Sequence, residues 1–376
     1  MLSADSVDVL LDVDTGVDDA HALLLALRHP GLNVVGVTTV AGNMDIKTVT
    51  TATLKVLDAA DAPMDLPVAM GCAHPLIEPT HFCPQIHGND ALGDLEPPLP
   101  PSARTVVKEH AVTFLISLLQ QRVDTNQSPL VLIALAPLTN IAMVVRMAPD
   151  VFKKAVAKVV WMGGAAFAGG NASQWGEANA AYDPEAAHIV LSSCGVPVYM
   201  YTWDVYLKVA FDTNDLVEYG CFEEEESGVV EDGKDGNGQD RGGKGDESGG
   251  ESSGEISNKS EGEENTKRRI LRKSASSWTT LATRLLLRDM SHFTMKAAQI
   301  GDAGAVAAVL CPEAITTKHM HVVVEMKGDH TRGMTVVDGR EEVCPPDKPK
   351  GEPNVHVVLD CDVEILKRCF ADVVFS

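Results

Sequence analysis

Four carboxylates lie within eight residues near the start of the chain, in the segment Asp12-Val-Asp14-Thr15-Gly16-Val17-Asp18-Asp19. They follow an apolar run and precede an apolar helical pattern, so they should lie close together in space. Carboxylates this close repel one another unless a cation lies among them. Carboxylate oxygens are the ligands that Ca²⁺ prefers. The segment therefore indicates a cation site, because capping the following helix would need only one aspartate.

Two other motifs compete for this segment. An EF-hand loop counted from Asp12 would need glycine at its sixth position and glutamate at its twelfth, where the chain has Val17 and Leu23, so an EF-hand is excluded. The Asp-x-Asp start also resembles that of haloacid-dehalogenase-like phosphatases, in which Asp12 would be the nucleophile. Such a phosphatase needs a later pair of acids, but Gly301-Asp302 is followed by Val306 where the second acid would stand. The phosphatase is therefore the weaker alternative.

The elements that must position these residues alternate between strands and helices. Strands are expected at residues 7–13, 32–40, 130–135, 157–162 and 196–203, and helices at residues 18–27, 44–60, 137–147 and 183–193. Residues 319–338 suggest a hairpin, and residues 355–373 a last strand and helix. This order predicts a single α/β domain with a doubly wound, mostly parallel sheet between flanking helices. Ligands of such sheets bind beyond the carboxyl ends of the strands, where the aspartates lie.

Six sequence blocks resemble those of the inosine-uridine preferring nucleoside hydrolase family, and they occur in the family's order. They are DVDTGVDDA with Thr15 in place of a proline, VTTVAGN ending at Asn43, IHGNDALGD from Ile86, LAPLTNIA from Leu135, WMGGAAFAGGN ending at Asn171, and GEANAAYDPEAA from Gly176. Together they span residues 8 to about 310. The resemblance implies hydrolysis of the N-glycosidic bond of ribonucleosides to a free base and ribose.

The resemblance also implies a cofactor, one Ca²⁺ held by Asp14, Asp19, the backbone carbonyl of Leu135 and Asp302. Water and two ribose hydroxyls would complete its shell, and Asp14 would be the general base that activates the attacking water. The chemistry agrees, because Ca²⁺ takes six to eight oxygen ligands in irregular geometry and needs no histidine or cysteine.

Substrate contacts are implied for Asp18, Asn43, Met162, Asn171, Glu177 and Asn179. Breaking the bond makes the sugar resemble an oxocarbenium ion, so oxygen atoms near the ring and groups that hold its hydroxyls would assist. Glu177 and Asn179 are two residues apart, which predicts a strand-like segment with both side chains facing the same way. A polar capping loop is the alternative for these two residues, and a core position is the alternative for Met162.

The chain departs from the family at Gly301-Asp302. Many members have histidine before this aspartate, as proton donor to the departing base. His87, Trp203 and Asp204 are candidates for a substitute donor, and the alternative for His87 is a loop histidine that supports the ribose side. Because the histidine is absent, a non-catalytic nucleoside or ribose binder is the second candidate function.

Composition limits the partners. The 376 residues carry a formal charge of −22 and give a pI near 4.8, which disfavours nucleic acid and anionic membranes. The chain has no run of 18 apolar residues. Its eight cysteines lack metal-type spacing, so we expect reduced thiols in a cytoplasmic protein. We expect the partner to be a small-molecule nucleoside and the protein to form a homo-oligomer, a dimer or a tetramer.

Residues 222–268 differ in composition from the rest of the domain, which we expect to span residues 1–376. They contain 15 acidic residues, 6 basic residues and 11 glycines, with few bulky apolar side chains. Such a segment cannot bury enough apolar surface to order itself, so we expect a disordered acidic insertion.

Overall fold

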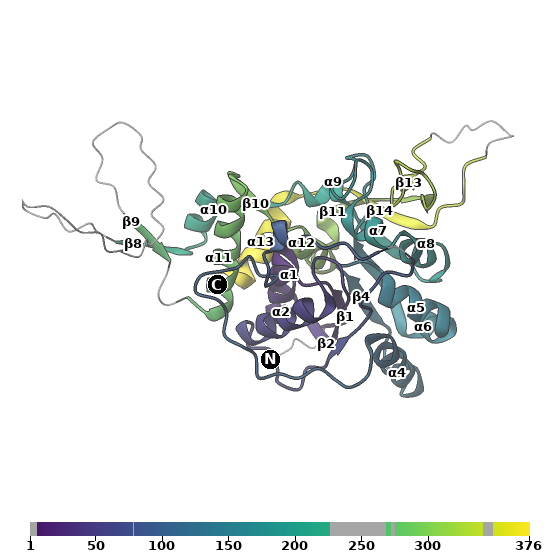
Figure 1. Cartoon of the computed structure of the whole chain (residues 1–376), viewed down its shortest axis with the longest axis horizontal. Coiled ribbons are helices and arrows are strands. Elements are labelled where there is room, and N and C mark those ends of the chain that lie inside the picture. Colours follow the sequence, from purple (N-terminus) through teal and green to yellow (C-terminus); the bar gives the residue numbers. More distant parts are fainter. Residues whose placement is uncertain (1–5, 78, 226–267, 272–274, 341–348) are drawn as a thin grey trace, which may run out of the picture.

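The computed structural model describes residues 6–77, 79–225, 268–271, 275–340 and 349–376. Its centre is one eight-stranded sheet (Figure 1). In spatial order the strands are β11 (Ile315–Met320), β14 (Val355–Cys361), β6 (Val198–Tyr201), β5 (Val156–Met162), β4 (Leu130–Ala134), β1 (Val7–Val13), β2 (Leu32–Thr39) and β3 (Val68–Met70). All neighbouring pairs are parallel except β11 with β14. The predicted mostly parallel sheet is confirmed.

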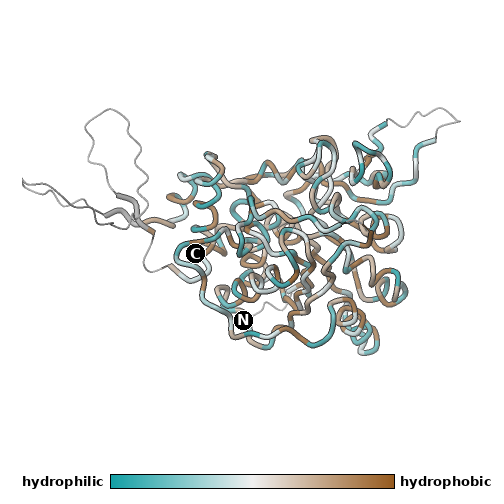
Figure 2. The backbone as a smooth tube through the Cα atoms, viewed as in Figure 1, coloured by the Kyte–Doolittle hydropathy of each residue, from teal (hydrophilic) through white to brown (hydrophobic). Residues whose placement is uncertain are grey.

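Helices cover both faces of the sheet because its central strands are apolar on both sides. In β1, Val9, Leu11 and Val13 belong to one buried cluster, whereas Leu10 belongs to the other. The first cluster includes residues of α1 (Val17–Arg28), α2 (Ile46–Ala59), α11 (Ser277–His292), α12 (Gly301–Leu310) and α13 (Val363–Val374). The second includes residues of α4 (Ala111–Asp124), α5 (Thr139–Met147), α6 (Pro149–Ala155) and α8 (Pro184–Ser193). Figure 2 shows hydrophobic stretches through the centre of the molecule.

Short elements lie around this body. The predicted hairpin is present as β12 (Val322–Val324) paired antiparallel with β13 (Thr335–Val337). A second small ladder pairs β7 (Ala210–Asp212) with β10 (Ala297–Gln299). The remaining helices are α3 (Pro84–His87), α7 (Ala178–Tyr182), α9 (Trp203–Tyr206), α10 (Thr213–Glu218) and the 3₁₀ turn Pro312–Ala314. In the described ranges no helix is both long and apolar enough to cross a membrane.

The ends of the predicted acidic insertion are structured. β8 (Phe222–Glu225) and β9 (Arg268–Leu271) pair antiparallel and lie side by side at one end of the molecule (Figure 1). The prediction of disorder therefore placed both boundaries too far outward, because pairing between distant segments satisfies backbone groups that local composition does not reveal. Residues 226–267 lie outside the described residues, so for them disorder stays a prediction.

Candidate active site

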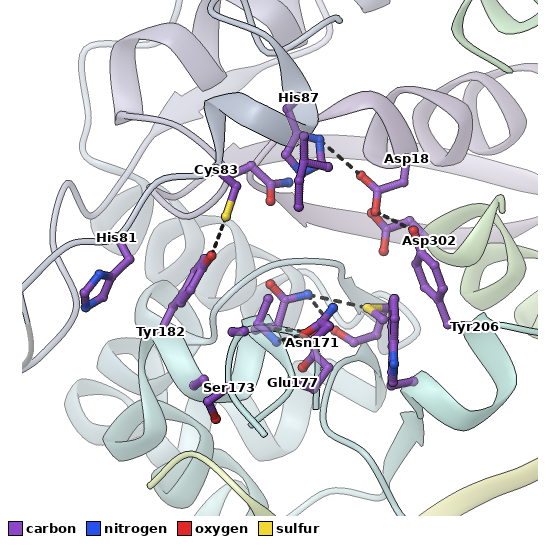
Figure 3. A pocket seen from close by; sticks show the side chains of 18 of the residues that line it. Asp18, His81, Cys83, His87, Asn171, Ser173, Glu177, Tyr182, Tyr206 and Asp302 are labelled. Carbon is purple, nitrogen blue, oxygen red and sulfur yellow. Dashed lines mark hydrogen bonds and ion pairs between the residues drawn. The ribbon is translucent and has the colours of Figure 1, made fainter. Parts of the chain in front are cut away.

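A cavity of about 760 Å³ opens beyond the carboxyl ends of the central strands (Figure 3). Its lining includes nine of the eleven predicted site residues: Asp18, Asn43, His87, Leu135, Met162, Asn171, Glu177, Asn179 and Asp302. The other two, Asp14 and Asp19, are buried. Two helix starts supply the acids, because Asp18 and Asp19 lie in the first turn of α1 and Asp302 in the first turn of α12. These two helices pack against each other.

The acids form a compact cluster. Carboxylate oxygens of Asp18, Asp19 and Asp302 lie within 4.8 Å of one another. Asp14 adjoins them, since repulsion from Asp19 contributes to raising its pKa. Burial, as the main cause, and the neighbouring negative charges together raise the pKa of Asp14, Asp19 and Asp302 well above the usual range. An empty cluster of this kind is costly to ionise, and a cation would remove that cost.

Unpartnered oxygen atoms test whether a cation fits. One buried oxygen each of Asp14, Asp19 and Asp302 makes no hydrogen bond within the described part of the chain. The carbonyl of Leu135 accepts a bond from Asn179 Nδ2 at 3.0 Å, and its second lone pair can serve another partner. This donor set consists of hard oxygen atoms, which suits Ca²⁺.

Asp14 is positioned by the segment that follows β2. Its Oδ2 accepts a hydrogen bond from the backbone N–H of Asn43 at 2.8 Å. A side chain at Gly42 would overlap the same oxygen, so the VAGN segment needs glycine there. The Asn43 amide donates to Asp19 Oδ2 at 3.2 Å, so one asparagine orients two acids of the cluster.

Asp12 plays a different part. Its buried Oδ1 accepts hydrogen bonds from Thr38 Oγ1 at 2.5 Å and Asn140 Nδ2 at 2.8 Å. Burial raises its pKa to about 7. Asp12 joins three neighbouring segments and is not among the residues that line the cavity.

The strand-like geometry predicted for Glu177 and Asn179 is wrong. Glu177 is the residue before α7, and its carboxylate accepts hydrogen bonds from the N–H groups of Asn179, Ala180 and Gly164 at 3.0, 3.2 and 2.6 Å. The first N–H groups of a helix have no partner within it, so a carboxylate at this position is favourable. Both side chains still line the cavity, because α7 begins at its wall.

Two other predicted residues, Met162 and Asn171, adjoin α7. The Asn179 amide donates to the Met162 carbonyl at 3.0 Å and lies 3.5 Å from its sulfur. Met162 is buried and also lines the cavity, so its contact with a sugar stays a prediction. Asn171 accepts a hydrogen bond from the Ala178 N–H at 2.8 Å.

A hydrogen bond to its ring nitrogen Nδ1 positions the side chain of His87. Nδ1 accepts a hydrogen bond from the backbone N–H of Val17 at 3.2 Å and lies 3.9 Å from Asp18 Oδ1. Burial lowers its pKa. The ring is therefore neutral at pH 7, with its proton on Nε2, and it supports the start of α1.

The other two donor candidates differ from each other. Trp203 lines the cavity. Asp204 instead accepts hydrogen bonds from the N–H groups of Ala166 and Phe167, both at 2.8 Å, and holds that loop outside the cavity lining. Tyr206 was missed by the sequence reasoning, although it lines the cavity and its hydroxyl donates to Asp18 Oδ2 at 3.1 Å (Figure 3). Its spacing of three from Trp203, on one face of a helix, was the available signal.

Comparisons with known proteins agree with the site. The family model described as inosine-uridine preferring nucleoside hydrolase matches residues 9–368. The inosine-uridine preferring nucleoside hydrolase of Leishmania major is 30% identical over 356 residues, which cover 94% of this chain and 93% of that protein. The probable uridine nucleosidase 2 of Oryza sativa subsp. japonica is 37% identical over 211 residues, 56% of this chain, and the match spans only 60% of that relative's length.

A solved structure of a nucleoside hydrolase also resembles this chain over nearly its whole length. The structure titled Inosine-Guanosine Nucleoside Hydrolase has a TM-score of 0.78 and 26% identity, with 98% of each chain covered. The family model and the relative from Leishmania major match nearly the whole length, and the chain belongs to the inosine-uridine preferring nucleoside hydrolase family.

Proposed function

We propose that this protein hydrolyses the N-glycosidic bond of ribonucleosides, releasing a free base and ribose, with Ca²⁺ as cofactor. The observation that carries the proposal is the acidic cluster. Asp14, Asp19 and Asp302 keep buried oxygens without a partner in the described part of the chain, and Asp18 and Asp302 of the same cluster line a cavity large enough for a nucleoside. Family membership supports the reaction type.

Asp14, Asp19, Asp302 and the Leu135 carbonyl would hold the cation. When bound, the cation supplies a positive field that lowers the pKa of a neighbouring water and binds sugar hydroxyls. Asp14 is the general base, because its Oδ2 is fixed by the Asn43 N–H while Oδ1 remains available to accept a proton. The water gives a proton to Asp14 as its oxygen adds to the anomeric carbon. The bond to the base breaks, its electron pair leaves with the base, and the base takes up a proton from water.

Asp18, Asn43, Met162, Asn171, Glu177 and Asn179 surround the sugar in this proposal. Burial raises the pKa of Glu177 to about 7, although three backbone N–H groups favour its ionised form. Its fixed oxygens lie in a water-poor wall, where they stabilise positive charge that develops on the ribose ring. His87 keeps α1 and Asp18 in place.

A reducing-sugar assay with inosine, uridine and adenosine tests this function. We expect release of ribose that stops when EDTA is added and returns with Ca²⁺ but not with buffer alone. An inert protein that still binds inosine in calorimetry would instead establish the non-catalytic binder. Cleavage of p-nitrophenyl phosphate, with no nucleoside cleaved, would overturn the proposal in favour of the phosphatase.

We also propose a cytoplasmic location and a homo-oligomer, dimer or tetramer. Cys72, Cys83, Cys194, Cys311, Cys361 and Cys369 are free thiols, which accords with a reducing compartment. Light scattering of the purified protein measures the oligomer, and microscopy of a tagged chain measures the location.

A further inference from the structure

Gly301 is a glycine for reasons of space. A Cβ atom at this position would overlap the Cγ, Cδ2 and Cε2 atoms of the Tyr206 ring. Its backbone is helical, at the first residue of α12, and does not have the positive φ that would itself favour glycine. The Tyr206 ring therefore occupies the volume that a side chain at 301 would take, directly beside Asp302.

The ring reaches this place from α9, a helix far from Gly301 in the sequence. Trp203 packs against it with ring centroids 4.5 Å apart and planes inclined by 31°. The Tyr206 hydroxyl donates a hydrogen bond to Asp18 at 3.1 Å. The ring is therefore held by the contact with Trp203 and by this hydrogen bond. Figure 3 shows Tyr206 on the same side of the cavity as Asp18 and Asp302, opposite Tyr182 and Cys83.

The cavity has two kinds of wall. Carboxylates and amides form the part that suits a sugar with several hydroxyls, whereas Trp203, Tyr206 and Phe293 supply aromatic surface. A base attached to that sugar is flat and presents a π face, and aromatic side chains bind such faces.

We propose that Tyr206, supported by Trp203, is the base-contacting residue of this site, and that Gly301 is required to admit its ring. This inference rests on the proposed function. Stacking accepts any base, so both purine and pyrimidine nucleosides are substrates. A purine has more ring area to stack, so it depends on Tyr206 more than a pyrimidine does.

Kinetics of two variants test the contact. For Tyr206→Ala we expect kcat/KM for inosine to fall by at least about tenfold, and for uridine by less, while Tyr206→Phe keeps the ring and stays within about threefold of wild type. In Tyr206→Ala the inhibition constant of ribose, which has no base, should change less than kcat/KM for inosine, because ribose binding loses only the hydrogen bond from Tyr206 to Asp18. Tyr199→Ala, which removes a stacked ring outside the cavity, is the control. Equal loss of ribose and inosine binding, or no loss, would overturn the proposal.

A double-mutant cycle tests the packing without relying on activity. Gly301→His should lower Tm because its Cβ overlaps the Tyr206 ring, and Tyr206→Ala in the same chain should restore part of that loss. A double variant whose Tm equals the sum of the single effects contradicts the packing claim. If wild type cleaves no nucleoside, hydrolysis fails as the function, and calorimetry of inosine against ribose still decides the role of Tyr206.

Discussion

Asp14, Asp19 and Asp302 each keep a buried oxygen that no group among the described residues satisfies. Such atoms are costly unless a ligand binds them, so they indicate where a ligand belongs. The neighbouring Asp12 also keeps a buried Oδ2 without a partner among these residues, but its Oδ1 is bonded to Thr38 and Asn140, and its pKa is raised by burial and not by a neighbouring carboxylate. Asp14, Asp19 and Asp302 differ from it because neighbouring carboxylates add to the rise in their pKa.

Asp14→Asn and Asp302→Asn should each weaken Ca²⁺ binding and lower kcat by at least about a hundredfold. Each change removes a buried charge that its neighbours repel, so stability in EDTA should not fall. Calorimetry with Ca²⁺, turnover of inosine and thermal unfolding in EDTA measure the three effects. Asp360→Asn, an exposed carboxylate paired with Lys208, is the control. If both site variants bind Ca²⁺ with the affinity of the wild type, these residues do not bind the cation.

The resemblance of six sequence blocks to the nucleoside hydrolase family predicted nine of the residues that line the cavity. The sequence did not indicate Tyr206, because the position of its ring depends on contact with Gly301, which lies nearly a hundred residues later in the chain. Packing between distant segments leaves no local pattern to read.

At the scale of elements, α12 shows how small residues place the site. Residues 301–308 of this helix are all buried, and it packs against α1, α9, α13 and β5. A side chain at Gly304 would overlap the hydroxyl of Tyr201, which is itself buried without a hydrogen-bond partner in the described chain. The helix that carries Asp302 is therefore set at its distance from the sheet by this contact.

Gly304→Ala should destabilise the protein by about 1–3 kcal/mol, because extra volume in a packed core forces neighbours to move. Tyr201→Phe removes the overlapping hydroxyl, so adding it should recover most of the loss. Urea unfolding of the two single variants and the double variant measures this. Unchanged stability of Gly304→Ala in both backgrounds would show that the helix is free to shift.

Strands were predictable because buried parallel strands are apolar runs bounded by turns. The five-residue α7 was not, since one turn and a half of polar and small residues shows no helical period, and its capping glutamate looked like part of a strand. Nor could the position of β14 beside β6 be predicted, because strand order is decided by packing across the whole chain.

For the whole molecule, buried carboxyl groups make stability depend on pH. The pKa of Asp12 and that of Glu177 are about 7, and those of the cluster are also raised. Above pH 6.5 the folded chain thus keeps protons that the unfolded chain has lost, so stability must fall as pH rises. The pKa values of His21 and His87 are lowered, and their opposite effect is confined to pH below 6.5.

Thermal unfolding in EDTA should therefore give a lower Tm at about pH 8 than at about pH 6.5. Saturating Ca²⁺ should raise Tm at both values, and more at the higher pH, because the cation binds the ionised cluster. A Tm in EDTA that rises steadily across this range would contradict the assignment.

The acidic insertion is expected to contribute little to the fold. Because β8 and β9 pair antiparallel, a short Gly/Ser turn can join them in place of residues 226–267. We expect Tm and kcat to change little, since the eight-stranded sheet and the cavity lining are made by other segments. A large fall in kcat would mean that the insertion acts on the site.

The cluster unites acids from the first helix with Asp302 from the twelfth. During synthesis, a chain that has just reached the insertion already contains β1 to β6 and the early aspartates, but not α12. Its acids then lack the partner that completes the cluster, and the groove lacks one wall. Completion of the cluster, and with it the proposed cation binding, can therefore occur only after most of the polypeptide has been made.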